Sequence, residues 1–167
     1  PGIAQTPLTF AIGRPPEGNI IRRVVSAGAP ADVLLLAVAP EKLVGFSSFD
    51  FSRQAAIPFP ESIRALPKLG RLAGRASTLS LEGLLALHPD LVVDCGNADE
   101  TWLSQARQVS AQTRIPWLLI NGELRQTPEQ LQAAGQALGM EARTAAQAAL
   151  AQRFIAQALA FSHTPAA

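Results

Sequence analysis

Residues 79–94 read LSLEGLLALHPDLVVD, and this stretch decides the fold. Its first half is amphipathic and predicts a helix that ends near Leu87. Pro89 cannot continue a helix, and it favours extended geometry for His88 before it. The run from Leu91 to Cys95 is almost continuously apolar, which is typical of a strand buried on both faces of a parallel sheet. The stretch therefore predicts a helix, a turn and a central strand of an α/β fold.

Short apolar strands alternate with helices on both sides of this stretch. This alternation predicts a Rossmann-like parallel sheet flanked by helices, with right-handed crossovers. We expect further strands at 22–26, 43–46, 68–70 and 115–120, and further helices at 31–38, 99–112 and 128–138.

The two ends of the chain differ from this pattern. A weak alternation followed by a Pro-Gly turn predicts a short N-terminal β-hairpin at about residues 8–21. An alanine-rich run at 141–161 predicts a long helix, and 162–167 a tail. We therefore expect an α/β lobe over residues 1–140, followed by a connecting helix.

Composition narrows the class of protein. The 167 residues are 48% hydrophobic and 16% charged, which suits a packed domain. The net charge of +1 gives no field that favours nucleic acid or a membrane surface as partner. The apolar runs are too short for a spanning helix. The single cysteine, Cys95, cannot form an internal disulfide and is interpreted as a buried small hydrophobe.

Several segments together resemble a known family. The stretch LExLLALxPDLV at 81–92 is joined by LPKLGR at 66–71, RVVSAG at 23–28, PEKLVG at 40–45 and IPWLLI at 115–120. Residues 130–143, QLQAAGQALGMEAR, complete the series. From about Pro7 to Phe161 the chain resembles periplasmic substrate-binding proteins of ABC importers for ferric siderophores, haem and cobalamin. The resemblance implies the N-terminal lobe plus the connecting helix, with the second lobe absent.

The resemblance implies capture of an iron chelate and its delivery to an inner-membrane permease, in the periplasm after removal of a signal peptide. A ferric siderophore is the preferred cargo, with haem and cobalamin as further candidates. We expect no enzyme activity and no cofactor. An isolated lobe would leave its partner-facing surface uncovered, which predicts self-association.

Ligands of open parallel sheets bind outside the carboxyl ends of the strands. Guanidinium groups suit the anionic oxygens of a ferric chelate, aromatic rings supply flat apolar contact, and amides donate hydrogen bonds. Each type also has an ordinary structural interpretation as loop charge, core side chain or turn former. The candidate ligand-binding residues are Arg71, Arg75, Phe46, Trp102, Asn97 and Asn121.

Two carboxylates have separate interpretations. By the resemblance, Glu82 of the LE motif docks into arginines of the permease, whereas a glutamate in a first helical turn also suits the macrodipole. Asp94 ends a strand at the expected cleft, where structural capping is the preferred role. His88 and His163 lack a partner at metal-ligand spacing, so no metal site is expected.

Two other function classes stay open. A small flavodoxin-like enzyme or nucleotide-binding domain would need a phosphate cradle at 26–30, where SAGAP offers a poor one. A sensor or interaction domain derived from the binding-protein lobe would lack the permease contact at Glu82.

Overall fold

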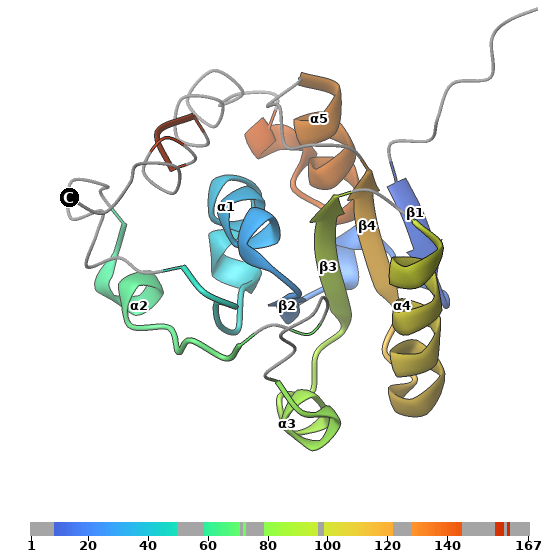
Figure 1. Ribbon diagram of the computed structural model, residues 1–167. Coiled ribbons are helices and arrows are strands. Elements are labelled where there is room, and N and C mark those ends of the chain that lie inside the picture. The colour runs from blue at the N-terminus through green and yellow to red at the C-terminus, as the bar shows by residue number, and fades with distance from the viewer. Residues whose placement is uncertain are drawn as a thin grey trace, which may run out of the picture.

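The computed structural model describes residues 9–49, 59–70, 72, 79–96, 99–121, 128–144, 156–158 and 160. Figure 1 shows strands and helices alternating along the chain. The strands are β1 (Thr9–Ile12), β2 (Val24–Ser26), β3 (Leu91–Gly96) and β4 (Trp117–Asn121), and the α-helices are α1 (Ala29–Val38), α2 (Glu61–Arg64), α3 (Leu81–Ala86), α4 (Glu100–Thr113) and α5 (Pro128–Ala137). The short 3-10 turns η1 (Gly18–Ile20) and η2 (Pro40–Lys42) complete the set.

The sheet has the order β1-β4-β3-β2 and is mixed rather than fully parallel. β2, β3 and β4 are parallel neighbours, as the sequence predicts. β1 lies antiparallel to β4 at the edge. The expected strand at 43–46 is reduced to isolated parallel bridges, from Leu43 to Val24 and from Phe46 to Lys68.

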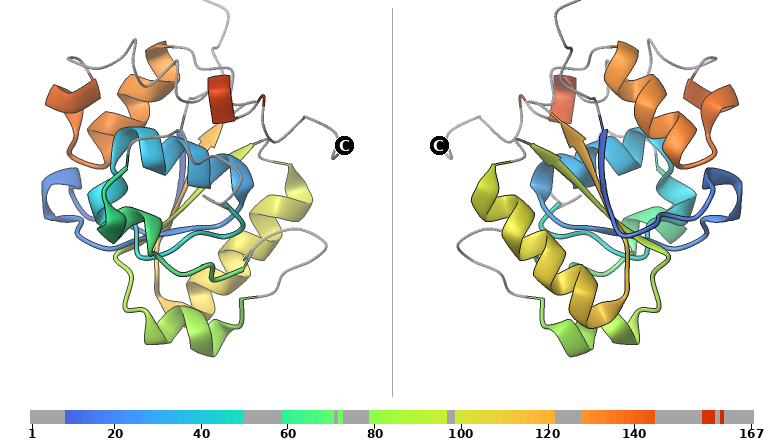
Figure 2. Two further views of the ribbon diagram at one scale, coloured as in Figure 1. Left: turned by 90° about the vertical axis from the view of Figure 1, so that its left-hand side faces the viewer. Right: turned by 90° about the vertical axis from the view of Figure 1, so that its right-hand side faces the viewer.

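Helices cover both faces of the sheet, so the fold has three layers (Figure 2). On one face α1 and α5 pack against Val24, Val93 and Ile120. On the other face α3 and α4 pack against Val25, Val92 and Trp117. Successive strand residues thus point to opposite faces and are buried on both, which explains the continuous apolar runs.

Local sequence signals set the helix ends. The Ser80 side chain caps α3 by accepting a 3.0 Å bond from the Gly83 amide, and Asp99 caps α4 through the Trp102 amide. Arg114 ends α4 in the left-handed conformation. His88 has a φ of 50°, so the expected extended geometry is wrong. It takes the left-handed turn that ends α3 and leads into β3.

The expected N-terminal hairpin is also wrong. Residues 9–12 form a strand, but their partner is β4, more than one hundred residues away in sequence. Residues 18–20 form the turn η1, and Ile21 is fully buried in the core next to α1. The alternation of residues 8–12 predicted a strand correctly but carried no information on its partner.

The PEKLVG segment at 40–45 forms hydrogen bonds and an ion pair with residues that follow α5. Lys42 Nζ donates hydrogen bonds to the carbonyl oxygens of Leu138 and Gly18, and burial lowers the pKa of this amine. Glu41 pairs with Arg143 at 2.7 Å. Gly139, at φ +70°, passes so close to Gly18 that a Cβ would lie 2.6 Å from its backbone. These contacts fix the segment that follows α1 against the segment that follows α5.

The predicted long helix lies mostly outside the described residues. Residues 141–144 and 156–158 are helical, and Ala158 is buried in the core formed by α1 and α5. Within the described part of the chain, no helix is long and apolar enough to cross a membrane.

Candidate functional site at the carboxyl edge of the sheet

The three parallel strands end on one edge of the sheet, at Ser26, Gly96 and Asn121. Figure 1 shows the arrowheads of β3 and β4 on the side where α4 begins, with α3 at the opposite end. We call this side the carboxyl edge. It is where an open parallel sheet presents backbone and side chains to a ligand.

Asp94 and Trp102 form a pair at this edge. The Trp102 indole Nε1–H donates a 2.6 Å hydrogen bond to Asp94 Oδ2, and the Cys95 amide donates a 2.8 Å bond to Oδ1. Asp94 is 7% exposed, and Trp102 is half-buried and packs against the core on the α3 and α4 side of the sheet. The bond holds the ring between the strand end and the first turn of α4. The centroids of the Trp102 and Trp117 rings are 6.0 Å apart, and the ring planes meet at 70°.

Burial raises the pKa of the Asp94 carboxyl above its ordinary value, and the bonds from Trp102 and Cys95 offset part of this rise. The Cys95 thiol is buried beside it, and burial first, then the Asp94 charge, raises its pKa well above the ordinary value. The thiol therefore stays protonated at neutral pH, in agreement with its interpretation as a buried hydrophobe.

Replacing Asp94 with Asn is expected to remove a pH-dependent loss of stability. Because the folded pKa lies above the unfolded one, the native state binds the proton more tightly, and stability falls as pH rises from about 3.8 through the raised folded pKa. Asn does not titrate. Urea unfolding over pH 3 to 7 should therefore show the variant gaining relative to the parent across this window and constant above it. A difference that stays flat throughout would contradict the assignment.

The loop after β2 lies against this pair. A Cβ placed on Gly28 would lie 3.6 Å from Asp94 Oδ1. Ser26 Oγ donates to the Gly28 carbonyl at 2.9 Å, and the Ala27 amide donates to Val93 O at the same distance. These bonds hold the small-residue turn flat against the end of β3. A ligand can therefore approach the backbone here closely.

Asp32, a residue of α1, holds the loop at residues 47–49 beside the carboxyl edge. It is fully buried, and its carboxylate accepts hydrogen bonds from the Ser47 amide and hydroxyl and from the amides of Ser48 and Phe49, all at 2.8–3.0 Å. The bonds fix residues 47–49 above the N-terminal part of α1. Sequence reasoning missed this residue, because a lone aspartate in an apolar helix gives no sign of which distant amides it will meet.

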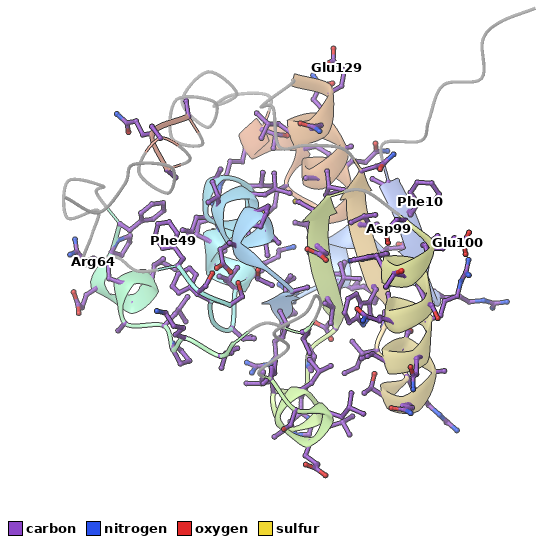
Figure 3. All side chains as sticks on the ribbon, viewed as in Figure 1. Phe10, Phe49, Arg64, Asp99, Glu100 and Glu129 are labelled. Atoms are coloured by element: carbon purple, nitrogen blue, oxygen red, sulfur yellow. The ribbon has the colours of Figure 1, made fainter. Side chains whose placement is uncertain are left out.

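Three acidic side chains lie at the carboxyl edge where α4 and α5 begin. Figure 3 shows Asp99 and Glu100 at the start of α4 and Glu129 at the start of α5, toward the end of the sheet where the strands terminate. All three are exposed. Acidic residues in first turns favour the helix macrodipoles. They also give this part of the edge a negative potential.

The structure separates the expected ligand contacts. Trp102 lies at the carboxyl edge, and Asn121 ends β4 there, with its carbonyl accepting a 3.3 Å bond from Gln130 Nε2. Phe46 does not face a ligand: it is 2% exposed and packs in the core, 5.6 Å from the ring of Phe49. From the sequence, a phenylalanine at a strand end can face either a ligand or the core. Here Phe46 faces the core, and its backbone forms a parallel bridge with Lys68. The expected contacts Arg71, Arg75 and Asn97 lie outside the described residues.

Glu82 lies on α3, at the end of the lobe away from the carboxyl edge (Figure 1). Its side chain is exposed in the first turn of the helix. Leu81 and Leu85 on the same helix are 37% and 45% exposed, which is high for large apolar residues. A cavity of about 490 Å³ lies between the start of α3 and the second half of α4. Among the described residues no group of three or more metal-ligating side chains comes together.

No protein-family model and no curated protein matches this chain. Solved structures of similar fold are solute-binding proteins. An ABC transporter solute-binding protein from Sulfurospirillum deleyianum has a TM-score of 0.62 at 22% identity, over 80% of this chain and 42% of its own. The molybdate-bound periplasmic protein MolA of Haemophilus influenzae has a TM-score of 0.55 at 17% identity, over 83% and 48%. Holo-ViuP has a TM-score of 0.51 at 22% identity, over 82% and 42%.

At these low identities, the TM-scores show a shared fold alone. The shared part is an α/β layer arrangement that makes up part of each protein. This chain spans less than half the length of each structure it matches.

Proposed function

We propose that this chain is the ligand-binding lobe of an extracytoplasmic solute-binding protein, which captures a small solute and delivers it to an ABC permease. The observation that carries the proposal is the fold match to solute-binding proteins, together with a carboxyl edge where a half-buried tryptophan and a backbone of small residues lie close together. Capture of this kind needs no covalent chemistry.

Capture takes place at the carboxyl edge. Trp102 offers ring surface, and its bond to Asp94 fixes the ring before the ligand arrives, which lowers the entropy lost on binding. Gly28 and Gly96 leave the backbone open, and a Cβ on Gly96 would meet nothing within 4 Å. In the solved structures of similar fold, more than half of each protein lies outside the matched part.

The arginines decide the preferred solute. Gly70 and Leu72, on either side of Arg71 in sequence, donate backbone bonds to Ser47 O and Ala27 O at 3.2 Å. Both acceptors belong to loops of the carboxyl edge, which supports a role for Arg71 there. As proposed ligand contacts, Arg71 and Arg75 supply the positive charge that an anionic solute requires. An anionic ferric chelate is therefore the preferred cargo, and haem and cobalamin are the alternatives.

Delivery uses the opposite end of the lobe. Leu81 and Leu85 are four residues apart and share one face of α3, with Glu82 beside them. Exposed apolar side chains around a carboxylate are the composition of a small protein interface, in which the charge sets register and the leucines lose contact with water. The permease supplies the matching arginines.

A titration of the protein with a panel of solutes tests this function. The panel contains a ferric siderophore, haemin, cobalamin and molybdate, with Trp102→Phe as the matched variant. Saturable binding of one class, weakened about tenfold in the variant through lost ring contact, is expected. Flavin or nucleotide that copurifies and no binding to any panel member would instead support the enzyme interpretation.

A further inference from the structure

A second concave site lies at the end of the lobe opposite the carboxyl edge. It is a groove of about 460 Å³ between the end of β1 and the second half of α4. Three arginines line it, Arg14, Arg107 and Arg114. The remaining lining residues are Ile12, Gly13, Ser110, Ala111 and Pro116, none of which is acidic.

The arginines come from two distant parts of the chain. Arg107 and Arg114 lie on α4 and at its end, whereas Arg14 follows β1, more than ninety residues earlier. Gly13 makes the meeting possible. With φ +79° it turns the chain away from the sheet, and a Cβ there would touch Pro116 and Ser110 Oγ at 3.4 Å. The turn thus holds Arg14 against the end of α4.

The groove concentrates positive charge without compensation. All three arginines are exposed, and within the described residues none of their guanidinium groups forms a recorded ion pair with a carboxylate. The chain as a whole has a net charge of only +1. Like charges that share a small groove repel each other, so the cluster gains from a bound anion.

The helix macrodipole explains part of this arrangement. A cation at the end of α4 compensates its exposed carbonyl groups, which accounts for Arg114 but not for Arg107 in the middle of the helix. It does not account for Arg14, which is brought to the same groove by a separate strand and a left-handed glycine. A third guanidinium adds repulsion once the helix end is compensated.

We propose that this groove is a binding site for an oxyanion of the phosphate class. Guanidinium groups approaching from two sides match an anion with several oxygen atoms, because each fork donates two hydrogen bonds. Ser110 Oγ donates to the Ile115 carbonyl at 2.8 Å and fixes the floor of the groove. The site is separate from solute capture, because it lies at the amino ends of the parallel strands.

Two titrations of the protein test the site and distinguish a soluble oxyanion from a lipid headgroup as its ligand. The first follows backbone amide resonances during addition of inorganic phosphate at constant ionic strength. The second measures cosedimentation with vesicles of phosphatidylglycerol, compared with phosphatidylcholine. Saturable shifts at residues 12–14 and 107–116 in the first point to a soluble oxyanion. Binding to phosphatidylglycerol vesicles alone points to a lipid headgroup.

Single-charge variants decide whether the groove is responsible. Arg107→Gln should weaken the observed binding about tenfold, because it removes a charged hydrogen-bond donor. Arg22→Gln removes one exposed arginine outside the groove and should leave binding within a factor of two. Binding in neither titration, or equal losses in the two variants, would overturn the proposal. Solute capture at the carboxyl edge is expected to be unchanged in Arg107→Gln. A failure of the anion site can therefore be distinguished from a failure of the proposed function.

Discussion

Glu82→Arg is expected to abolish solute uptake while leaving solute binding unchanged. Glu82 is exposed on α3 between two exposed leucines, at the end of the lobe away from the carboxyl edge. If it pairs with permease arginines, reversing its charge replaces an attraction with a repulsion. The loss of a close charge pair at an interface costs roughly 2–5 kcal/mol, which corresponds to docking weaker by about thirtyfold to several thousandfold.

The control is Glu61→Arg, which makes the same charge change in the first turn of α2. Both substitutions lose a similar macrodipole contribution, so any difference between them reflects position. Uptake and stimulation of permease ATP hydrolysis are measured with the full-length protein. Normal uptake by the Glu82→Arg variant would exclude docking through this residue, whereas no uptake by the parent protein would favour an interaction domain that has lost transport.

Asp32→Ala is expected to lower the free energy of unfolding by about 3–5 kcal/mol. The buried carboxylate accepts four hydrogen bonds from residues 47–49, and its removal leaves several donors without a partner. A domain of this size has a total stability of roughly 5–15 kcal/mol, so the loss is severe. Asp32→Asn keeps the shape but only one acceptor oxygen, and an intermediate loss is expected.

Urea denaturation measures this effect, with Asp90→Ala as the matched control. Asp90 also accepts bonds from two backbone amides, those of Arg22 and Arg23, but at an exposed site. Water replaces its bonds, so a loss of about 1 kcal/mol is expected. Similar losses in the two variants would show that burial of the Asp32 cluster contributes little.

The sequence predicted elements whose signals are local. The apolar run at 91–95 became β3, and the helices expected at 99–112 and 128–138 became α4 and α5. The pairing partners of the strands were harder to predict, because β1 pairs with a strand that is distant in sequence. The same alternation of residues fits a strand of a local hairpin and an edge strand that pairs antiparallel with a distant strand.

The site was predicted less well, for physical reasons. Trp102 lies at the carboxyl edge, as expected for a residue in the first helical turn after a strand exit, and its contact with a ligand stays a prediction. Phe46 was assigned to the ligand although it is core, since an aromatic residue carries no mark of the face it occupies. Asp32 and the groove of Arg14, Arg107 and Arg114 depend on contacts across the fold, which spacing along the chain does not encode.

The indole N–H resonances of the two tryptophans provide the most direct test of solute capture at the carboxyl edge. Trp102 Nε1 is bonded to Asp94 at this edge, whereas Trp117 Nε1 is buried in the core without a hydrogen-bond partner, and the two rings lie in contact. Each solute of the panel is added to the protein, with gallium replacing iron in the siderophore and in haem to avoid paramagnetic broadening. We predict a saturable shift of the Trp102 indole with one solute, accompanied by the amides of Ala27, Gly28 and Gly96. Resonances at the carboxyl edge that stay unchanged with every solute would contradict capture at this edge.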